Sequence, residues 1–216
     1  MDMFSTAAAY FHKGGYVMYI LLLCSIFVVT IAVERARFFA RADVGRAFGR
    51  KFCEVMGQGE YDVAQSMASS ASGILPEILT GVFHLVMGKG HGLSGFLEVQ
   101  SGIALSQFRR RLYYLNVIVT LSPLLGLLGT IIGMISAFSV FNLDSGQATA
   151  ITGGVGEALI ATAFGLCVAI LSLVVHSYFT QRIENIVTDM EQCFSLMEEH
   201  QEEMRKTLRT EGGATA

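Results

Sequence analysis

Charged residues are scarce in this sequence. Asp, Glu, Lys and Arg form 15% of its 216 residues, well below the roughly 25% of an ordinary soluble domain. Hydrophobic residues form 52%, which favours one integral membrane unit over two soluble domains. An excess of positive charge is also lacking, since the formal net charge is −3. Nothing in the composition therefore suggests a nucleic-acid partner.

Patterns that carry catalysis or bind metals are missing too. The four cysteines are scattered along the chain, without the paired spacing of a metal site or a disulfide framework. The cysteines are interpreted as small buried or incidental residues. His84 and His91 have no nucleophile or metal-ligand pattern nearby, and are interpreted as solvated or packing histidines. We therefore predict a protein that is not an enzyme and that needs no metal or cofactor.

Three apolar runs dominate the sequence: residues 16–33, 115–141 and 151–179. A helix of about 20 residues crosses a bilayer, and each run has close to that length or more. The first run is followed by Glu34 and Arg35 rather than by a cleavage site of small residues. It is interpreted as a retained transmembrane helix, not a signal peptide. The predicted fold is an all-α integral membrane protein with three transmembrane helices.

Basic residues predict the orientation. Of the 15 Lys and Arg residues, only Lys13 precedes the first run and none lies in 142–150. By the positive-inside rule, the short N-terminus 1–15 and the link 142–150 face away from the cytoplasm; in a bacterial inner membrane that side is the periplasm. Residues 34–114 are then a cytoplasmic helical domain. Residues 180–216 are a cytoplasmic helical tail whose last residues are disordered.

Helical spacing appears twice in the cytoplasmic domain. The residues are Phe48, Phe52, Val55 and Met56, and then Ile74, Ile78, Val82, Leu85 and Val86. Pro76 suits the first turn of the second helix, after Ser72 or Gly73, and the glycines of 88–92 break the chain. From about Leu93 the sequence predicts one helix that continues without interruption into the second span.

The tail predicts a long helix, because no Gly or Pro occurs between Gly165 and Gly212. Its apolar residues form a heptad-like seam that steps by fours and threes. The seam comprises Ile183, Val187, Met190, Phe194, Met197, Met204 and Leu208. The spacing of these apolar residues alone leaves two interpretations open: a helix packed within its own subunit, or a bundle that forms an oligomer.

Small residues share one face of the second run and one face of the third. The predicted helix-packing residues are Pro123, Gly126, Gly129 and Gly133, and then Ala161, Gly165 and Ala169. Such faces let helix backbones approach closely in lipid. Thr130 and Thr162 lie on the same faces, and would face each other only if the two spans pack through them. Singly, each threonine is expected to bond its own backbone; beside an aqueous path, each could order water.

Glu157 is the only formal charge between Asp144 and Arg182. A carboxylate inside a bilayer costs at least a few kcal/mol, so it needs a partner, water or a proton. A buried structural carboxyl is one interpretation, but intramembrane acids are default candidates for ion pathways. We favour an ion pathway that includes Glu157, Thr130 and Thr162. Nothing else in these spans is charged, so any relay must include water or an acid from a partner chain.

Two segments carry a resemblance to a known family. Residues 122–134 (SPLLGLLGTIIGM) followed by 153–166 (GGVGEALIATAFGL) closely resemble the paired signature of the MotA/TolQ/ExbB proton channel family. The ExbB/TolQ branch fits best, because the chain is small and has three predicted spans. Relatives in that branch usually carry a proline in the third span, where this chain has Leu171 and Ser172. The third helix is therefore expected to be straighter than theirs.

The resemblance implies more than the residues alone establish. It implies a homopentamer in the bacterial inner membrane, with the second and third spans around a central pore. It implies a single-span partner of ExbD or TolR type that brings an intramembrane aspartate, and a periplasm-spanning partner of TonB or TolA type. Glu157 then stands at the pore glutamate, and Thr130 and Thr162 at the pore threonines. Proton motive force would drive mechanical work for outer-membrane transport or envelope integrity.

Three alternatives stay open. The ion could be sodium, since hard cations also favour oxygen ligands. The output could be another one, such as motility. The chain could also be a passive membrane scaffold in which Glu157 is only a buried structural acid.

Overall fold

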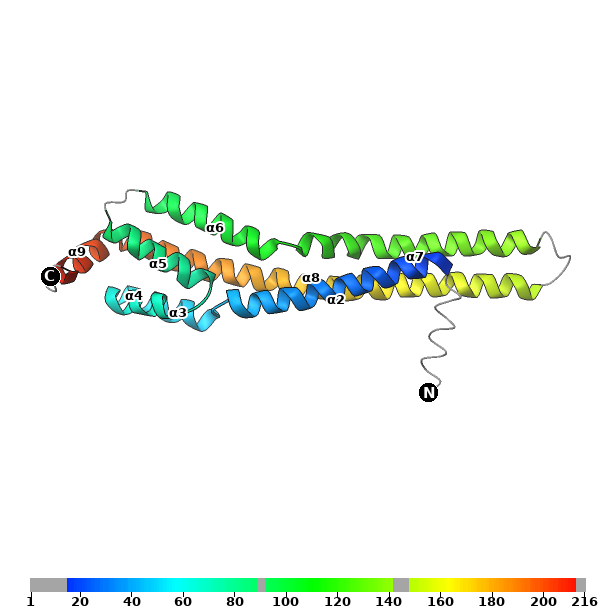
Figure 1. Cartoon of the computed structure of the whole chain (residues 1–216), viewed down its shortest axis with the longest axis horizontal. Coiled ribbons are helices and arrows are strands. Elements are labelled where there is room, and N and C mark those ends of the chain that lie inside the picture. The colour runs from blue at the N-terminus through cyan, green and yellow to red at the C-terminus, as the bar shows by residue number, and fades with distance from the viewer. Residues whose placement is uncertain (1–14, 89–91, 142–147, 213–216) are drawn as a thin grey trace, which may run out of the picture. The chain divides into compact units, whose positions relative to one another are not determined.

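The computed structural model describes residues 15–88, 92–141 and 148–212 (Figure 1). Within these ranges it leaves out the side chains at 139–141, 148–153, 157 and 209–212. The described residues form eight α-helices and no strand, which confirms the predicted all-α class. The helices are α2 (Gly15–Ala42), α3 (Arg46–Gly57), α4 (Tyr61–Ser70), α5 (Ile74–Met87), α6 (Leu93–Arg109), α7 (Leu112–Phe141), α8 (Ala148–Glu199) and α9 (Gln201–Gly212). The predictions for residues 1–14, for most of the link 142–150 and for the last residues lie outside the described part.

The chain divides into two compact units. The first, here called the membrane unit, comprises the described residues of 1–34 and 111–178. The second unit comprises those of 35–110 and 179–216. Helices α2 and α8 each contribute residues to both units.

Three stretches of the described helices are long and apolar enough to cross a membrane: Gly15–Gly57, Leu93–Phe138 and Gly154–Glu199. Large apolar side chains of the membrane unit are exposed, including Leu23 at 66%, Leu124 at 61% and Ile170 at 62%. Large contiguous apolar surfaces are rare on soluble monomers and mark contact with a membrane or another protein. The described residues thus contain the three long apolar helices that the sequence predicts.

The prediction of one unbroken helix from Leu93 into the second span is wrong. Helix α6 ends at Arg109 and α7 begins at Leu112. Arg110 is extended, with ψ 134°, and Arg111 has φ 70°. A non-glycine residue in the left-handed region is uncommon, and no Gly or Pro announces it here. The Arg111 guanidinium pairs with the Glu34 carboxylate at 3.1 Å, within the membrane unit.

In the second unit, the two predicted helices are present as α3 and α5, with Gly73 directly before α5 and Pro76 in its first turn. Helix α4 was not predicted. Its buried face consists of Tyr61, Ala64 and Ala68, so it lacks the large apolar residues that make helical spacing visible. Helices α3 to α6 pack in sequential pairs, and α9 contacts α4 and α5.

The tail seam packs within its own chain. Ile183, Met190, Met197 and Met204 are each at most 4% exposed. Phe179 stacks on Phe39 of α2 with ring centroids 5.3 Å apart. These side chains are covered by other helices of the second unit, so the first interpretation of the heptad-like seam holds for them. The long helix ends at Glu199, and α9 continues after His200.

Helix α9 is also held by a polar contact. The Tyr61 hydroxyl of α4 donates to a carboxylate oxygen of Glu203 at 2.9 Å. Tyr61 is 4% exposed. Burial, then the hydrogen bond and negative charge of Glu203, raise the pKa of the Tyr61 hydroxyl.

Candidate functional site

Helices α7 and α8 lie side by side in the membrane unit (Figure 1). Their small residues bring the two backbones close together. A Cβ built on Gly126 would lie 2.9 Å from the Cα of Thr162, and one on Gly133 would lie 2.9 Å from the Cβ of Ala158. Real Cβ atoms essentially never approach so closely. The glycines therefore permit a backbone separation that larger residues would prevent.

The same close contact extends along both helices. A Cβ on Gly129 would lie 2.7 Å from the Cβ of Ala161, and one on Gly165 would lie 2.6 Å from the carbonyl oxygen of Ser122. Gly165 thus faces backbone, which cannot move aside as a flexible side chain can. By contrast, a Cβ on Gly156 would meet nothing within 4 Å. The small residues that meet α7 therefore occupy one side of α8.

Of the other predicted packing residues, Ala169 is 7% exposed. Pro123 lies inside α7 and is only half-buried. Its ring removes one main-chain donor from the helix, yet α7 continues through it as one helix to Phe141.

Hydroxyl groups add polar contacts at this interface. The Thr162 hydroxyl donates to the carbonyl oxygen of Gly126 at 3.0 Å. The buried Ser172 hydroxyl donates to the carbonyl oxygen of Leu115 at 2.9 Å. Both bonds cross from α8 to α7, where a polar group in lipid must find a protein partner. In the sequence, Ser172 lies on the same small-residue face of the third run as Ala169 and Gly165.

Thr130 behaves differently from Thr162. Its hydroxyl donates to the carbonyl oxygen of Leu127 in its own helix at 2.6 Å. The two threonines therefore each donate to a main-chain carbonyl and not to each other. A hydroxyl that donates its proton still has lone pairs that can accept. Both threonines could thus accept a hydrogen bond from water or supply an oxygen to a cation.

Glu157 lies in helix α8, but its side chain is outside the described part of the structure. Its position in the helix is three residues after Gly154 and four before Ala161. Gly154 approaches the Cβ of Ala137 on α7, and Ala161 approaches Gly129. Residues three and four apart share a helix face, so position 157 lies on the side of α8 near this interface. Position 162, five residues on, is about 140° further around the helix.

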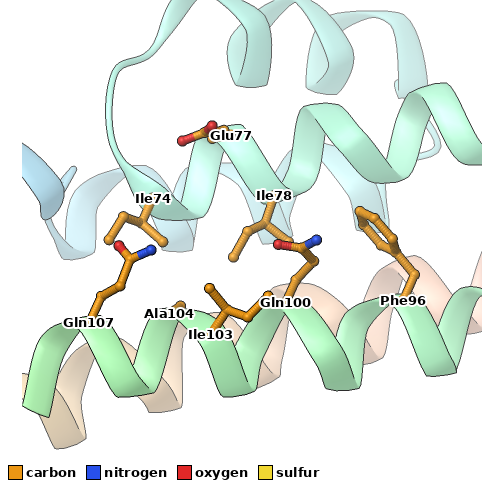
Figure 2. Close-up of a pocket in the computed structure, with 8 residues that line it drawn as sticks. All are labelled: Ile74, Glu77, Ile78, Phe96, Gln100, Ile103, Ala104 and Gln107. Carbon is orange, nitrogen blue, oxygen red and sulfur yellow. The ribbon is translucent and has the colours of Figure 1, made fainter.

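The second unit contains a hollow of about 270 Å³ between α5 and α6 (Figure 2). It is lined by Ile74, Glu77, Ile78, Phe96, Gln100, Ile103, Ala104 and Gln107. The lining combines apolar side chains with two amides and one carboxylate, and it offers no nucleophile with an adjacent base. Among the described residues, no group of three or more His, Cys, Asp or Glu side chains could hold a metal ion. The α7–α8 interface therefore remains the candidate site.

These features define a class: a multi-pass helical membrane protein whose second and third spans pack through small residues, beside a single intramembrane acid. The model of the MotA/TolQ/ExbB proton channel family matches residues 78–192. The chain belongs to this family.

Individual relatives agree with that assignment. A biopolymer transport protein of Synechocystis sp., described as ExbB-like 1, is 34% identical over 172 residues, which cover 76% of this chain and 67% of the relative. An ExbB homolog of Methanothermobacter thermautotrophicus is 25% identical over 194 residues, 88% of this chain and 69% of the relative. The ExbB of Salmonella typhimurium is 35% identical over 71 residues, 32% of this chain and 29% of the relative. These relatives support the ExbB-like branch.

Proposed function

We propose that this chain is the proton-channel subunit of an ion-driven motor in the bacterial inner membrane. In this proposal it converts proton motive force into mechanical work for outer-membrane transport or envelope integrity. The observation that carries the proposal is Glu157, the one formal charge between Asp144 and Arg182. It lies in the apolar helix α8 of a chain that belongs to a proton channel family.

In the proposed pathway, Glu157 accepts and releases the proton. A carboxyl group can carry a proton in one step and give it up in the next, which is the chemistry that such a pathway needs. The hydroxyl groups of Thr130 and Thr162 each donate their proton in a hydrogen bond to a main-chain carbonyl. They therefore act as acceptors that order water beside the acid. The small residues of α7 and α8 keep the two helices together while the ion passes.

The proposed assembly is a homopentamer around an ExbD/TolR-like single-span partner. Neither 115–141 nor 151–179 contains a charged residue other than Glu157, so a second acid for a relay has to come from another chain. The exposed apolar side chains of the membrane unit, such as Leu124 and Ile170, leave surface for such neighbours and for lipid. A TonB- or TolA-like protein would carry the work across the periplasm.

The proposed orientation follows the basic residues. The N-terminus and the link 142–150 face the periplasm, and the second unit and the C-terminus face the cytoplasm. Spans 16–33, 115–141 and 151–179 cross the membrane. Ten of the 15 Lys and Arg residues lie in 34–114 and four follow 179, which supports this orientation.

Two alternatives differ in ion or output. Sodium could replace the proton, because hydroxyl and carboxylate oxygens suit hard cations, and the output could be motility. A third alternative is a passive scaffold with a structural Glu157. A neighbouring gene that encodes one span with an aspartate near its start, followed by a periplasmic domain, favours the motor. Its absence favours the scaffold.

The test replaces Glu157 with Gln, which keeps the size of the side chain and removes its acidity. The variant is expected to assemble with the partner as the wild type does and to abolish motor-dependent uptake. Glu157→Asp, which keeps the acid, is the matched control and should retain part of the activity. If Glu157→Gln supports full uptake, the assignment of Glu157 to the pore is wrong and the passive-scaffold alternative is favoured.

A further inference from the structure

Two cysteines far apart in the sequence meet in the second unit. The Sγ atoms of Cys53 in α3 and Cys193 in α8 are 3.6 Å apart. The Cys193 thiol also lies 3.8 Å from the carbonyl oxygen of Gly49, one turn earlier in α3. All four cysteines are free thiols, and sequence spacing gave no sign of this pair.

The two helices come close at this point because small residues meet there. A Cβ built on Gly49 would lie 3.4 Å from the Cβ of Asp189. Gly49 and Cys53 are four residues apart on α3, and Asp189 and Cys193 are four apart on α8, so each pair shares a helix face. A disulfide usually joins Cα atoms about 4.4–6.8 Å apart, and such a separation needs closely packed backbones. The two sulfur atoms are 3.6 Å apart and have to approach by roughly 1.5 Å to reach the S–S bond length of about 2.05 Å.

Access to the two thiols is unequal. Cys53 is half-buried and borders a hollow of about 570 Å³, which is also lined by Thr188, Glu191, Gln192, Ser195 and Leu196. Cys193 is fully buried. A small reagent therefore reaches Cys53 first and leaves Cys193 as the second, internal thiol.

We propose that Cys53 and Cys193 form an oxidation-sensitive dithiol, in which a small peroxide oxidises Cys53 and Cys193 then closes a disulfide between α3 and α8. In the first step the Cys53 sulfur attacks the peroxide, the O–O bond breaks, and Cys53 sulfenic acid and one water form. In the second step the Cys193 sulfur attacks the Cys53 sulfur and a second water leaves. Two thiols thus lose two electrons and two protons, and hydrogen peroxide becomes two waters.

The reaction is slow while both thiols are protonated. Burial raises the pKa of both thiols, and the thiolate is the reactive form. In the proposed cytoplasmic orientation, reducing thiols would also reopen the bond, so the disulfide would be transient. The reaction with peroxide should accelerate about tenfold per pH unit between pH 6 and 8, in proportion to the thiolate fraction.

The test uses the purified full-length chain in detergent, treated with hydrogen peroxide, blocked with N-ethylmaleimide and digested with trypsin. Cleavage after Lys and Arg puts Cys53 alone in peptide 52–89 and Cys193 alone in peptide 183–205. The expected product is these two peptides joined, two hydrogens lighter than their sum, and separated again by dithiothreitol. Cys53→Ser should abolish the product, and the matched control Cys167→Ser should leave it unchanged.

A second readout needs no oxidation. Phenylarsine oxide, a trivalent arsenical that bridges adjacent thiols, should add one arsenical to the wild-type chain and none to Cys53→Ser. This readout tests the pair even if Cys193 variants fail to fold, since Cys193 remains in place. The proposal is overturned if Cys53 proceeds to sulfinic acid without a linked peptide, if only links between copies form, or if the arsenical binds wild type and Cys53→Ser equally.

Discussion

The first prediction concerns how closely α7 and α8 pack. It is tested by adding a methyl group to α7 at Gly129 and removing one from α8 at Ala161. In Gly129→Ala the new Cβ would lie 2.7 Å from the Cβ of Ala161, which is 1% exposed. Overpacking of this kind costs about 1–3 kcal/mol. The higher helix propensity of alanine offsets up to about 1 kcal/mol of that cost. We therefore expect a net loss of roughly 1–2 kcal/mol.

The partner change should restore the interface. Ala161→Gly removes the methyl that the new one meets, so the double variant carries one methyl at the contact, as the wild type does. A coupling energy of about 1–3 kcal/mol is expected, which is typical of residues in contact. Gly156→Ala, in the same helix and with nothing within 4 Å of its Cβ, is the matched control and should cost nothing.

The assay is reversible unfolding in mixed detergent micelles, followed by energy transfer between dyes attached to α7 and α8. Each single variant and the double variant are measured at the same detergent composition. The reasoning is refuted if Gly129→Ala is as stable as Gly156→Ala. It is also refuted if the losses of the two single variants add in the double variant, since the two residues would then not be in contact.

Three further changes test single hydrogen bonds. Ser172→Ala removes the bond to the Leu115 carbonyl and should cost about 0.6 kcal/mol in the same assay, up to about 1.7; a loss equal to that of the exposed Ser177→Ala would contradict it. Tyr61→Phe should cost about 1–2 kcal/mol at pH 7, because it removes a hydrogen bond to a carboxylate. The pKa of the Tyr61 hydroxyl is raised in the folded protein. The stability that this group contributes is therefore fully present below about pH 10, its ordinary pKa, and is lost as the pH rises through the raised pKa. The Phe variant should therefore lose less stability than wild type from pH 9 to 11, and parallel curves would refute this. Thr162→Val should lower ion flux severalfold without abolishing it, whereas Thr162→Ser should keep it; an unchanged rate in the Val variant would make Thr162 purely structural.

Much of the membrane unit could be predicted from the sequence, because long uncharged runs are a strong signal for membrane-spanning helices. The faces of small residues also predicted which sides of α7 and α8 could approach, and the structure brings Gly126 and Thr162 together. The role of Glu157 stays a prediction, since it concerns a side chain in contact with water or a partner.

Other features could not be predicted for physical reasons. The break at Arg110 and Arg111 carries no Gly or Pro, so local propensity gave no signal. Helix α4 buries one tyrosine and two alanines, and no large aliphatic residue. The meeting of Cys53 and Cys193 depends on how α3 packs on α8, and spacing along the chain contains no information on it. The heptad-like seam predicted that one face of the tail helix is buried. It could not predict whether the same chain or another subunit covers that face.

The most direct test of the central claim is proton flux through the purified complex with its single-span partner, reconstituted in liposomes and driven by a potassium diffusion potential. The wild type should acidify the lumen, Glu157→Asp should do so more slowly, and Glu157→Gln should match protein-free liposomes while retaining the wild-type stoichiometry. Wild-type flux through the intact Glu157→Gln complex would contradict the account.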